Sequence, residues 1–184
     1  MDASIAALMT SRLVLRPLDL ADSDAIQAVF PRWEIVRFMA AHIPWPYPED
    51  GALTYLRDVA LPAMQRGVEW HWSIRPRAEA RRLIGVISLM DPAGDNRGFW
   101  LAPEWQGRGL ASEASAAVTD YWFDTLGRSV LRASKAAANT PSRRISERTG
   151  MRLVWRGERD YVSGRLPAEL WEITADEWRA MRGT

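Results

Sequence analysis

The sequence predicts an α/β (α+β) fold, with a mixed central sheet of about six to seven strands and flanking helices. Two observations predict it. Residues 69–101 hold three short apolar or alternating runs separated by turn residues, which is the pattern of a strand meander. Residues 108–125 then change to a helical period, and strand and helix patterns alternate from there onward. The expected order is strand, helices, three strands, helix, strand, helix and two strands.

The first half of the chain supplies one strand and several helices. Residues 12–18 alternate polar and apolar side chains and end at Pro17, which predicts a strand. Asp19 and Asp22 offer caps for a helix over 22–30. In the proline-rich stretch that follows, we expect a short helix at 34–41 and then a loop. Apolar residues at helical spacing predict another helix over 50–66.

The middle of the chain supplies the meander. Residues 69–75 alternate and place Trp70, Trp72 and Ile74 on one face of a strand. Residues 83–90 form a continuous apolar run, as a buried central strand does. After a cluster of turn residues, 97–101 forms a further short strand.

The last third begins with the clearest helix. Apolar residues recur at helical spacing over 108–125, which predicts an amphipathic helix. Residues 130–136 predict a strand. Asn139 or Thr140 caps the next helix, which ends near Gly150. Two final strands are expected at 152–160 and 167–173.

Composition indicates a single folded domain over residues 1–184. Hydrophobic residues are 47% and charged residues 26%, which argues against disorder. The chain has no cysteine and only two histidines, His42 and His71, so we expect no disulfide, no cysteine nucleophile and no metal. A net charge of +1 disfavours nucleic acid, and no apolar run is long enough for a membrane span. Because the start lacks a signal-peptide pattern, we expect a cytoplasmic protein.

Two compositional biases stand out. Lys135 is the only lysine among 24 basic residues, which we attribute to the codon usage of a GC-rich genome. The chain also has ten tryptophans, enough to serve both a core and a ligand pocket.

The segment Gln106-Gly107-Arg108-Gly109-Leu110-Ala111 carries the most chemical information. It joins a strand to the long helix, and its glycines let the backbone turn sharply and approach a ligand. Free N–H groups at the helix start then favour an anion such as a pyrophosphate. A tight turn without a ligand is the alternative. The segment is neither a Walker loop nor a dinucleotide fingerprint, because no Gly-Lys-Ser/Thr follows and the strands before it form a meander.

Here the chain resembles the GCN5-related N-acetyltransferase (GNAT) family. Gln106-x-x-Gly109-x-Ala111 is similar to that family's Gln/Arg-x-x-Gly-x-Gly/Ala loop. Thr10 to Pro17, Asn139-Thr140-Pro141-Ser142 with Gly150, and Ile173 to Trp178 resemble segments of its RimJ/RimL-like branch of bacterial ribosomal-protein N-terminal acetyltransferases. The chain departs from the family at Arg143, Ser146 and Thr149, where apolar residues are frequent.

The resemblance implies a sheet that splays where acyl-CoA binds, and an enzyme that moves an acetyl group from acetyl-CoA to a primary amine. A non-catalytic acyl-CoA-binding module on the same fold is the alternative. The partner is then an amine, either a protein N-terminus or a small molecule, with no nucleic acid and no membrane; a homodimer is left open. The residues expected to contact acetyl-CoA are Trp100, Leu101, Gln106, Gly107, Arg108, Gly109, Leu110, Ala111, Asn139 and Ser142.

Several of these residues have a structural alternative. In the family, a hydroxyl at the position of Ser142 can protonate the departing CoA thiolate, but a serine there also caps a helix. Asn139 would hydrogen-bond the pantetheine or serve as the N-cap. Arg108 would contact a phosphate or lie in solvent. Backbone N–H groups near Trp100 and Leu101 would bind the acetyl carbonyl.

The base that takes the proton from the amine is less defined. His71 is the candidate, because imidazole accepts protons near neutral pH, with Glu69 and Asp91 as alternatives. His71 could equally be structural, with water carrying the proton. Two isolated histidines do not indicate a Ser–His–acid arrangement. We therefore expect direct attack by the amine in a ternary complex, without an acyl-enzyme.

Tryptophans are expected to line the path of the amine. Trp33, Trp45 and Trp70 are the candidates for substrate binding, since aromatic side chains suit a cationic or apolar substrate end. A role in the core is the alternative for each of them.

Overall fold

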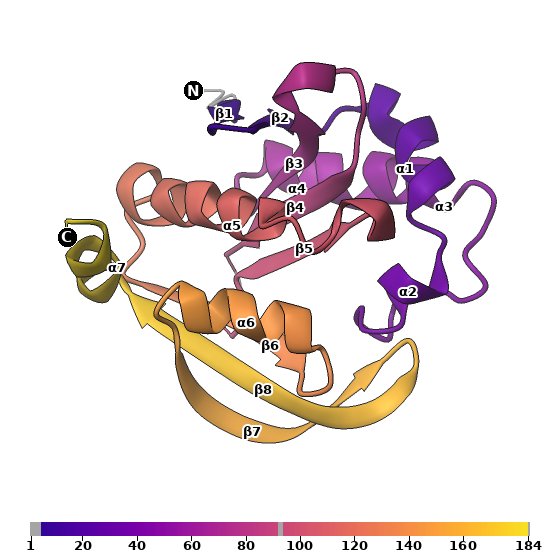
Figure 1. Ribbon diagram of the computed structural model, residues 1–184. Coiled ribbons are helices and arrows are strands. Elements are labelled where there is room, and N and C mark those ends of the chain that lie inside the picture. Colours follow the sequence, from indigo (N-terminus) through magenta and orange to yellow (C-terminus); the bar gives the residue numbers. More distant parts are fainter. Residues whose placement is uncertain (1–4, 92–93, 184) are drawn as a thin grey trace.

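The computed structural model describes residues 5–91 and 94–183 (Figure 1). It contains two antiparallel sheets, one of five strands in the order β1-β2-β3-β4-β5 and one of three in the order β6-β8-β7. The first is built from β1 (Leu8–Met9), β2 (Leu13–Pro17), β3 (Glu69–Pro76), β4 (Gly85–Met90) and β5 (Arg97–Leu101). The second is built from β6 (Val130–Ala136), β7 (Arg152–Tyr161) and β8 (Gly164–Thr174).

Helices cover both sheets. In Figure 1, α5 lies across the first sheet, α6 lies over the second, and α7 packs at the end of β8. The helices are α1 (Ser23–Val29), α2 (Trp33–Val36), α3 (Gly51–Tyr55), α4 (Leu61–Gln65), α5 (Leu110–Asp120), α6 (Thr140–Arg148) and α7 (Ala175–Arg182). Short 3-10 turns lie at Leu20–Asp22, Arg77–Glu79 and Pro103–Trp105, and π-helical turns at Leu56–Ala60 and Tyr121–Thr125.

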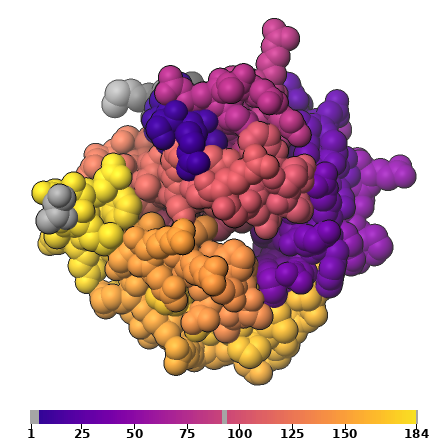
Figure 2. All heavy atoms as spheres, in the orientation of Figure 1, coloured from indigo at the N-terminus to yellow at the C-terminus, as the bar shows by residue number. Residues whose placement is uncertain are grey.

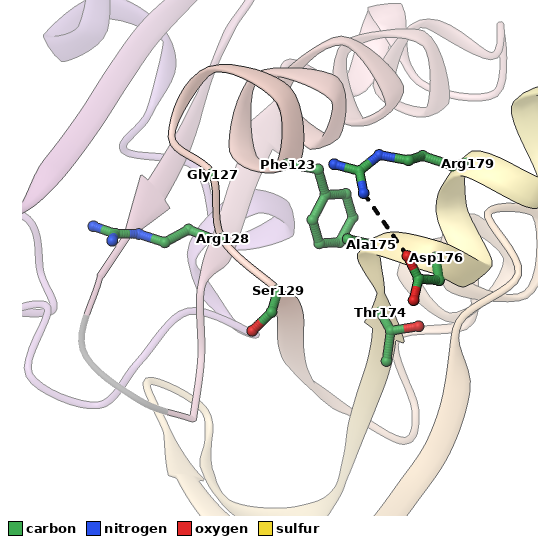
Figure 3. Close-up of a pocket in the computed structure, with 8 residues that line it drawn as sticks. All are labelled: Phe123, Gly127, Arg128, Ser129, Thr174, Ala175, Asp176 and Arg179. Atoms are coloured by element: carbon green, nitrogen blue, oxygen red, sulfur yellow. Dashed lines mark ion pairs between the residues drawn. The ribbon is translucent and has the colours of Figure 1, made fainter.

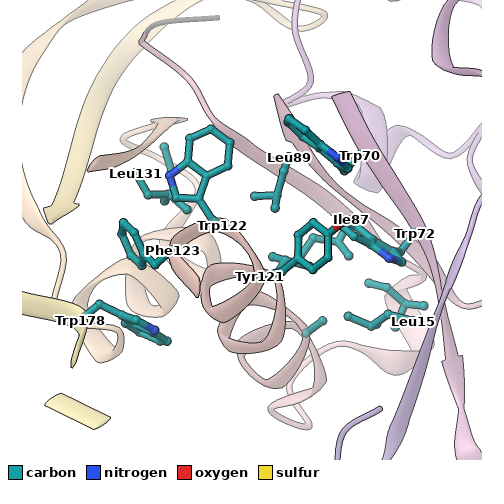
Figure 4. Packing of buried hydrophobic residues seen from close by; sticks show 14 of the residues in the cluster. Leu15, Trp70, Trp72, Ile87, Leu89, Tyr121, Trp122, Phe123, Leu131 and Trp178 are labelled. Carbon is teal, nitrogen blue, oxygen red and sulfur yellow. The ribbon is translucent and has the colours of Figure 1, made fainter. Parts of the chain in front are cut away.

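The main core lies between the first sheet and α5. Trp72 is fully buried and meets the ring of Tyr121 edge-on, with 5.2 Å between centroids. Trp70 meets Trp122 in the same way at 6.3 Å (Figure 4). A second cluster fills the opposite face of the sheet, where α1 and α3 contribute Ile26 and Ala52. The strand alternation therefore sends odd and even residues of β3 to two different environments.

The two sheets are tied together at one end. Asn96 donates its backbone N–H to the carbonyl of Arg132 at 2.7 Å and accepts from the Arg132 N–H through Oδ1 at 2.9 Å. Asp95 accepts from the Ser134 N–H at 2.9 Å. Beyond this tie, β5 and β6 belong to different sheets. The strands β5 and β6 are therefore held together at the Asn96 end and diverge toward the other end, which splays the two sheets apart.

The structure confirms the expected order of elements and their strands. The helix expected at 34–41 is wrong in its second half, because α2 ends at Val36. Beyond it, the carbonyls of Arg37 and Met39 accept hydrogen bonds from Ser163 and Val162 in the β7–β8 turn, which pulls the chain out of helical geometry. The sequence did not predict β1 or α7. Within the described ranges, no helix is long and apolar enough to cross a membrane.

Candidate active site

A cavity of about 610 Å³ lies where the two sheets diverge. Its walls come from α2 and the residues after it, from β5, from the loop to α5, and from α6. In Figure 2 the surface is hollowed where the purple, red and orange segments meet. The cavity brings together most residues expected to contact acetyl-CoA: Trp100, Leu101, Gln106, Gly107, Gly109, Leu110, Ala111, Asn139 and Ser142.

The loop before α5 is held in one conformation from both sides. Gly107 and Gly109 have φ of +73° and +77°, the left-handed region that glycine adopts without strain. Gln106 donates from its side-chain amide to the Leu101 carbonyl at 2.8 Å. Arg12 donates to the Arg108 carbonyl at 2.9 Å. Gly107 and Gly109 both line the cavity, and because glycine has no side chain they present only backbone atoms to it.

The start of α5 offers free backbone donors. The first bond inside the helix runs from the Glu113 N–H to the Gly109 carbonyl, so Leu110, Ala111 and Ser112 have no acceptor within the helix. These N–H groups and the helix dipole favour an anion. No three His, Cys, Asp or Glu side chains group as a metal site in the part of the chain that the structure describes.

Glu113 fastens this helix to the turn between β1 and β2. Its carboxylate accepts from the Thr10 hydroxyl at 2.5 Å, from the Arg12 backbone N–H at 2.8 Å and from Arg12 Nε at 2.7 Å. Partial burial alone would raise the pKa of Glu113, but these hydrogen bonds outweigh it and lower the pKa to about 2. Glu113 is thus a structural anchor for the loop.

The ladder between β4 and β5 fixes which backbone donors of β5 face the gap. Ala102 donates to Ile84, and Asn96 accepts from Met90, so the even-numbered residues of β5 bond to β4. The N–H groups of Phe99 and Leu101 therefore point toward β6. The Trp100 N–H points to β4, so the expected donor near Trp100 moves to Phe99.

Asn139 and Ser142 lie together at the start of α6. Asn139 is the N-cap, and its Oδ1 accepts from the Ser142 backbone N–H at 3.3 Å. The cap is therefore supplied by Asn139, which leaves the Ser142 hydroxyl without a capping task. Two residues that the sequence reading missed, Arg144 and Arg148, also line the cavity from this helix. Their i, i+4 spacing on one helix face is the signal that could have found them.

His71 is buried on the face of β3 opposite to Trp70, with a relative exposure of 2%. Its Nδ1 lies 2.6 Å from Ser88 Oγ and its Nε2 lies 2.7 Å from Glu69 Oε2. The sequence does not indicate this grouping of Ser88, His71 and Glu69, because Ser88 meets His71 only through the pairing of β3 with β4. Asp91, another candidate base, pairs with Arg128 at 2.7 Å.

The tryptophans expected along the amine's path divide into two groups. Trp70 is 6% exposed and packs in the main core, so its predicted role in substrate binding is wrong. Alternation turns Trp70 toward α5 together with Trp72. Trp33 and Trp45 are half exposed and pack against each other, with 5.5 Å between ring centroids. Arg108 stacks on Trp105 at 5.1 Å, and its contact with a phosphate stays a prediction.

Behind the cavity lies a buried polar cluster. Lys135 donates to the Ser146 hydroxyl, and both are buried between β6 and α6. Burial lowers the pKa of Lys135 to about 7, and the nearby charge of Arg97 lowers it as well. Arg97 donates to the Thr119 hydroxyl at 2.9 Å. Ser146, a departure from the family's apolar residues, is therefore explained by its bond to Lys135.

A second cavity of about 280 Å³ lies beyond the far end of α5 (Figure 3). It is lined by Phe123, Ser129 and the start of α7, where Arg179 pairs with Asp176 at 3.8 Å. None of the residues expected to bind acetyl-CoA or the amine, or to act in catalysis, lines it. About four turns of helix separate it from the glycine loop.

Comparison with known proteins agrees with this geometry. Residues 12–152 match the family model described as acetyltransferase (GNAT) domain. The chain is 30% identical over 148 residues to the uncharacterized N-acetyltransferase YoaA of Bacillus subtilis. The aligned region covers 78% of this chain and 81% of that protein.

Solved structures share the fold. The ribosomal-protein-S5-alanine acetyltransferase of Vibrio fischeri superposes with a TM-score of 0.80 at 15% identity, covering 95% of this chain and 99% of that one. The spermidine N-acetyltransferase of Vibrio cholerae, solved with CoA and spermine, superposes with a TM-score of 0.76 at 20% identity, covering 92% and 99%.

Proposed function

The chain belongs to the GNAT acetyltransferase family and is an acetyl-CoA-dependent N-acetyltransferase, and from that premise we propose that its acceptor is a compact primary amine with one positive charge and an apolar body. The observation that carries this proposal is a bridge over the acceptor side of the cleft. Ala40 pairs with Tyr161, and Val162 donates to the Met39 carbonyl at 3.0 Å. Phe38 and Met39, next to this bridge, line the cavity, so an acceptor that enters on this side would pass the bridge, which favours a small molecule over a folded protein's N-terminus.

The cavity lining supports the single charge and the apolar body. Phe38, Met39 and Trp100 contribute apolar surface. The charged residues of the wall are Arg37, Arg144, Arg148 and the single acid Glu34. Because we assign Arg144 and Arg148 to the phosphates of acetyl-CoA, the acceptor side offers the single carboxylate of Glu34, and the further positive charges of a polyamine would have no acidic partner there.

Acetyl-CoA is proposed to lie along the splay. The free N–H groups of Leu110, Ala111 and Ser112 would hold the pyrophosphate, and the bare backbone of Gly107 and Gly109 gives it room. Arg144 and Arg148 would supply charge to the phosphates.

The reaction would be direct attack of the amine on the thioester while both substrates are bound. The N–H groups of Phe99 and Leu101 would donate to the carbonyl oxygen as negative charge develops there. The amine nitrogen forms a bond to the carbonyl carbon, the carbon–sulfur bond breaks, and Ser142 gives a proton to the departing thiolate and regains one from the nitrogen of the amide product. The ammonium proton must leave before the attack.

An acceptor panel tests the proposal. Initial rates of CoA release would be measured with 2-phenylethylamine, with spermidine and with a hexapeptide that has a free N-terminus; N-acetylated phenylethylamine is the control. We expect the highest kcat/KM with 2-phenylethylamine. A higher value with the hexapeptide would assign the site to protein N-termini, and a higher value with spermidine would assign it to polyamines.

A further inference from the structure

Three residues form one row across the central strands of the first sheet. His71 on β3 lies opposite Ser88 on β4, and Ser88 lies opposite Gly98 on β5. Residues directly opposite each other in an antiparallel ladder place their side chains on the same face. The row therefore runs from the buried His71 toward β5, the edge strand that borders the cleft.

The hydrogen bonds along this row have a direction. Neutral imidazole has one donor and one acceptor nitrogen. A carboxylate only accepts, so Nε2 of His71 donates to Glu69 at 2.7 Å. Nδ1 is then the acceptor, and the Ser88 hydroxyl donates to it at 2.6 Å. The arrangement is ready to take up a proton at Nδ1.

At the β5 end of the row, the space above Gly98 is open. A Cβ added to Gly98 would meet only the terminal methyl of Met90, at 3.7 Å, so there is space above Gly98 beside the half-buried Ser88. Trp100, which lines the cavity, projects from the same face of β5 two residues further on. Two residues along a strand span about 7 Å. Ser88 and Gly98 are not themselves lining residues of the cavity, so an acceptor ammonium would reach Ser88 through the space above Gly98.

The other end reaches water. The Glu69 side chain is 24% exposed, whereas His71 beneath it is 2% exposed. Tyr55 covers the imidazole edge-on, with 6.3 Å between ring centroids. Burial first, and then the charge of Glu69, raise the pKa of Tyr55 to about 12, so this phenol keeps its proton and cannot act as the base. The row connects the cleft to solvent through a covered histidine.

We propose that Ser88, His71 and Glu69 form a proton relay that deprotonates the acceptor ammonium. The inference rests on the proposed function. Ser88 takes a proton from the ammonium as its own hydroxyl proton passes to His71 Nδ1. The amine is left neutral with a free electron pair, the serine is unchanged, and the imidazolium is stabilised by the Glu69 carboxylate. Ser88 is the catalytic residue, His71 stores the proton, and Glu69 is a positioning residue.

The surroundings of Ser88 favour this role over that of a nucleophile. β4 is paired on both sides, with β3 and with β5, so its backbone N–H groups are engaged in the two ladders. An acyl-serine needs nearby donors for its oxyanion. The free donors, on Phe99 and Leu101, point into the gap toward β6, away from the ladder that holds Ser88.

Single-turnover rates in three variants test the relay, with 2-phenylethylamine as acceptor. We expect Ser88→Ala to lower kcat about tenfold to a hundredfold and His71→Gln about a hundredfold or more, with a small change in KM. Ser73→Ala is the matched control, because Ser73 is a buried hydroxyl on the same face of β3 that donates instead to the Arg16 carbonyl and accepts from Arg75. Binding of CoA, measured by calorimetry, should stay unchanged in all three.

A second acceptor separates a proton relay from a loss of structure. Hydroxylamine is largely unprotonated at neutral pH, so it needs no base before attack. Rates with hydroxylamine should stay within about threefold of the unsubstituted enzyme in Ser88→Ala and His71→Gln. Equal losses with both acceptors would overturn the relay, as would an acetyl group trapped on Ser88. If the unsubstituted enzyme turns over neither acceptor, the proposed acceptor class fails instead.

Access to Ser88 can be closed without touching the relay. Gly98→Val would place methyl groups in the open space above the strand, and its φ lies outside the left-handed region. We expect kcat/KM for 2-phenylethylamine to fall at least about tenfold while CoA affinity is kept. Unchanged kcat/KM would show that the amine does not pass Ser88.

Discussion

Asn96 and Arg132 exchange two hydrogen bonds, of 2.7 and 2.9 Å, across the boundary between the two sheets. Asn96 is 5% exposed, so its side chain has little access to water that could replace a lost bond. The pair holds β5 against β6 at the closed end of the splay. The width of the cleft therefore depends on a polar contact that contributes no atom to the cavity wall.

The first prediction concerns this tie. Asn96→Ala removes the side-chain acceptor of the part-buried Arg132 N–H and the side-chain donor to the Met90 carbonyl, and we expect the free energy of unfolding to fall by about 1–3 kcal/mol. CoA binding should weaken as well, because the strands that flank the cleft loosen. Thermal unfolding and calorimetry measure the two effects. An unfolding free energy equal to that of the unsubstituted chain would contradict the tie.

The second prediction concerns the glycine loop. Gly109 has a φ of +77°, and a Cβ there would meet the Arg12 guanidinium at 3.4 Å. Gly109→Val should weaken CoA binding at least about tenfold, because the backbone must leave the left-handed region and its donors turn away. Gly67→Val is the matched control: its φ of +66° imposes the same strain, with nothing within 4 Å of the added Cβ. Equal CoA affinity in folded Gly109→Val and in the control would remove the loop from the binding site.

The third prediction separates Ser142 from Asn139. Because Asn139 Oδ1 caps α6 at the Ser142 N–H, Asn139→Ala should cost about 0.5–2 kcal/mol of stability. Ser142→Ala should leave stability nearly unchanged and lower kcat about tenfold to a hundredfold, since a thiolate is already a fair leaving group. Full kcat in Ser142→Ala, measured in single turnovers, would refute the role of its hydroxyl as an acid.

The fourth prediction concerns the only lysine of the chain. Burial, and then the charge of Arg97, lower the pKa of Lys135 to about 7, against about 10.4 for a free side chain. Between these values the unfolded chain binds a proton that the folded chain lacks, so stability should rise as pH increases from about 7 to about 9. In a chain labelled with ¹⁵N-lysine, one side-chain resonance should titrate near pH 7. Lys135→Met should lose this part of the pH dependence, and a resonance that titrates near pH 10 would refute the assignment.

Local sequence patterns predicted the strands because their alternation and their turn residues are encoded within a few positions. Periodicity also placed Trp70 and Trp72 on one face of β3, but it could not say which face borders the cleft. That choice depends on where α5 packs, so Trp70 was wrongly assigned to the substrate path. The end of α2 was missed for a similar reason, since it depends on bonds to Ser163, far along the chain.

In the candidate site, too, the residues in local motifs could be predicted, and those that depend on distant parts of the chain could not. The glycine loop and Ser142 lie in contiguous motifs, and the structure brings them to one cavity. The bonds of His71 were out of reach of the sequence: Glu69 is two positions away on the same strand, but Ser88 meets His71 only through the register of β3 with β4. Arg144 and Arg148 were also missed, because their relevance depends on how α6 lies against the loop.

Direct passage of acetyl from acetyl-CoA to a bound amine can be tested with initial rates measured while both substrates are varied. Direct transfer predicts intersecting double-reciprocal lines, and an intact protein mass that is unchanged after incubation with acetyl-CoA alone. Parallel lines, together with a protein that carries one transferable acetyl group, would contradict it.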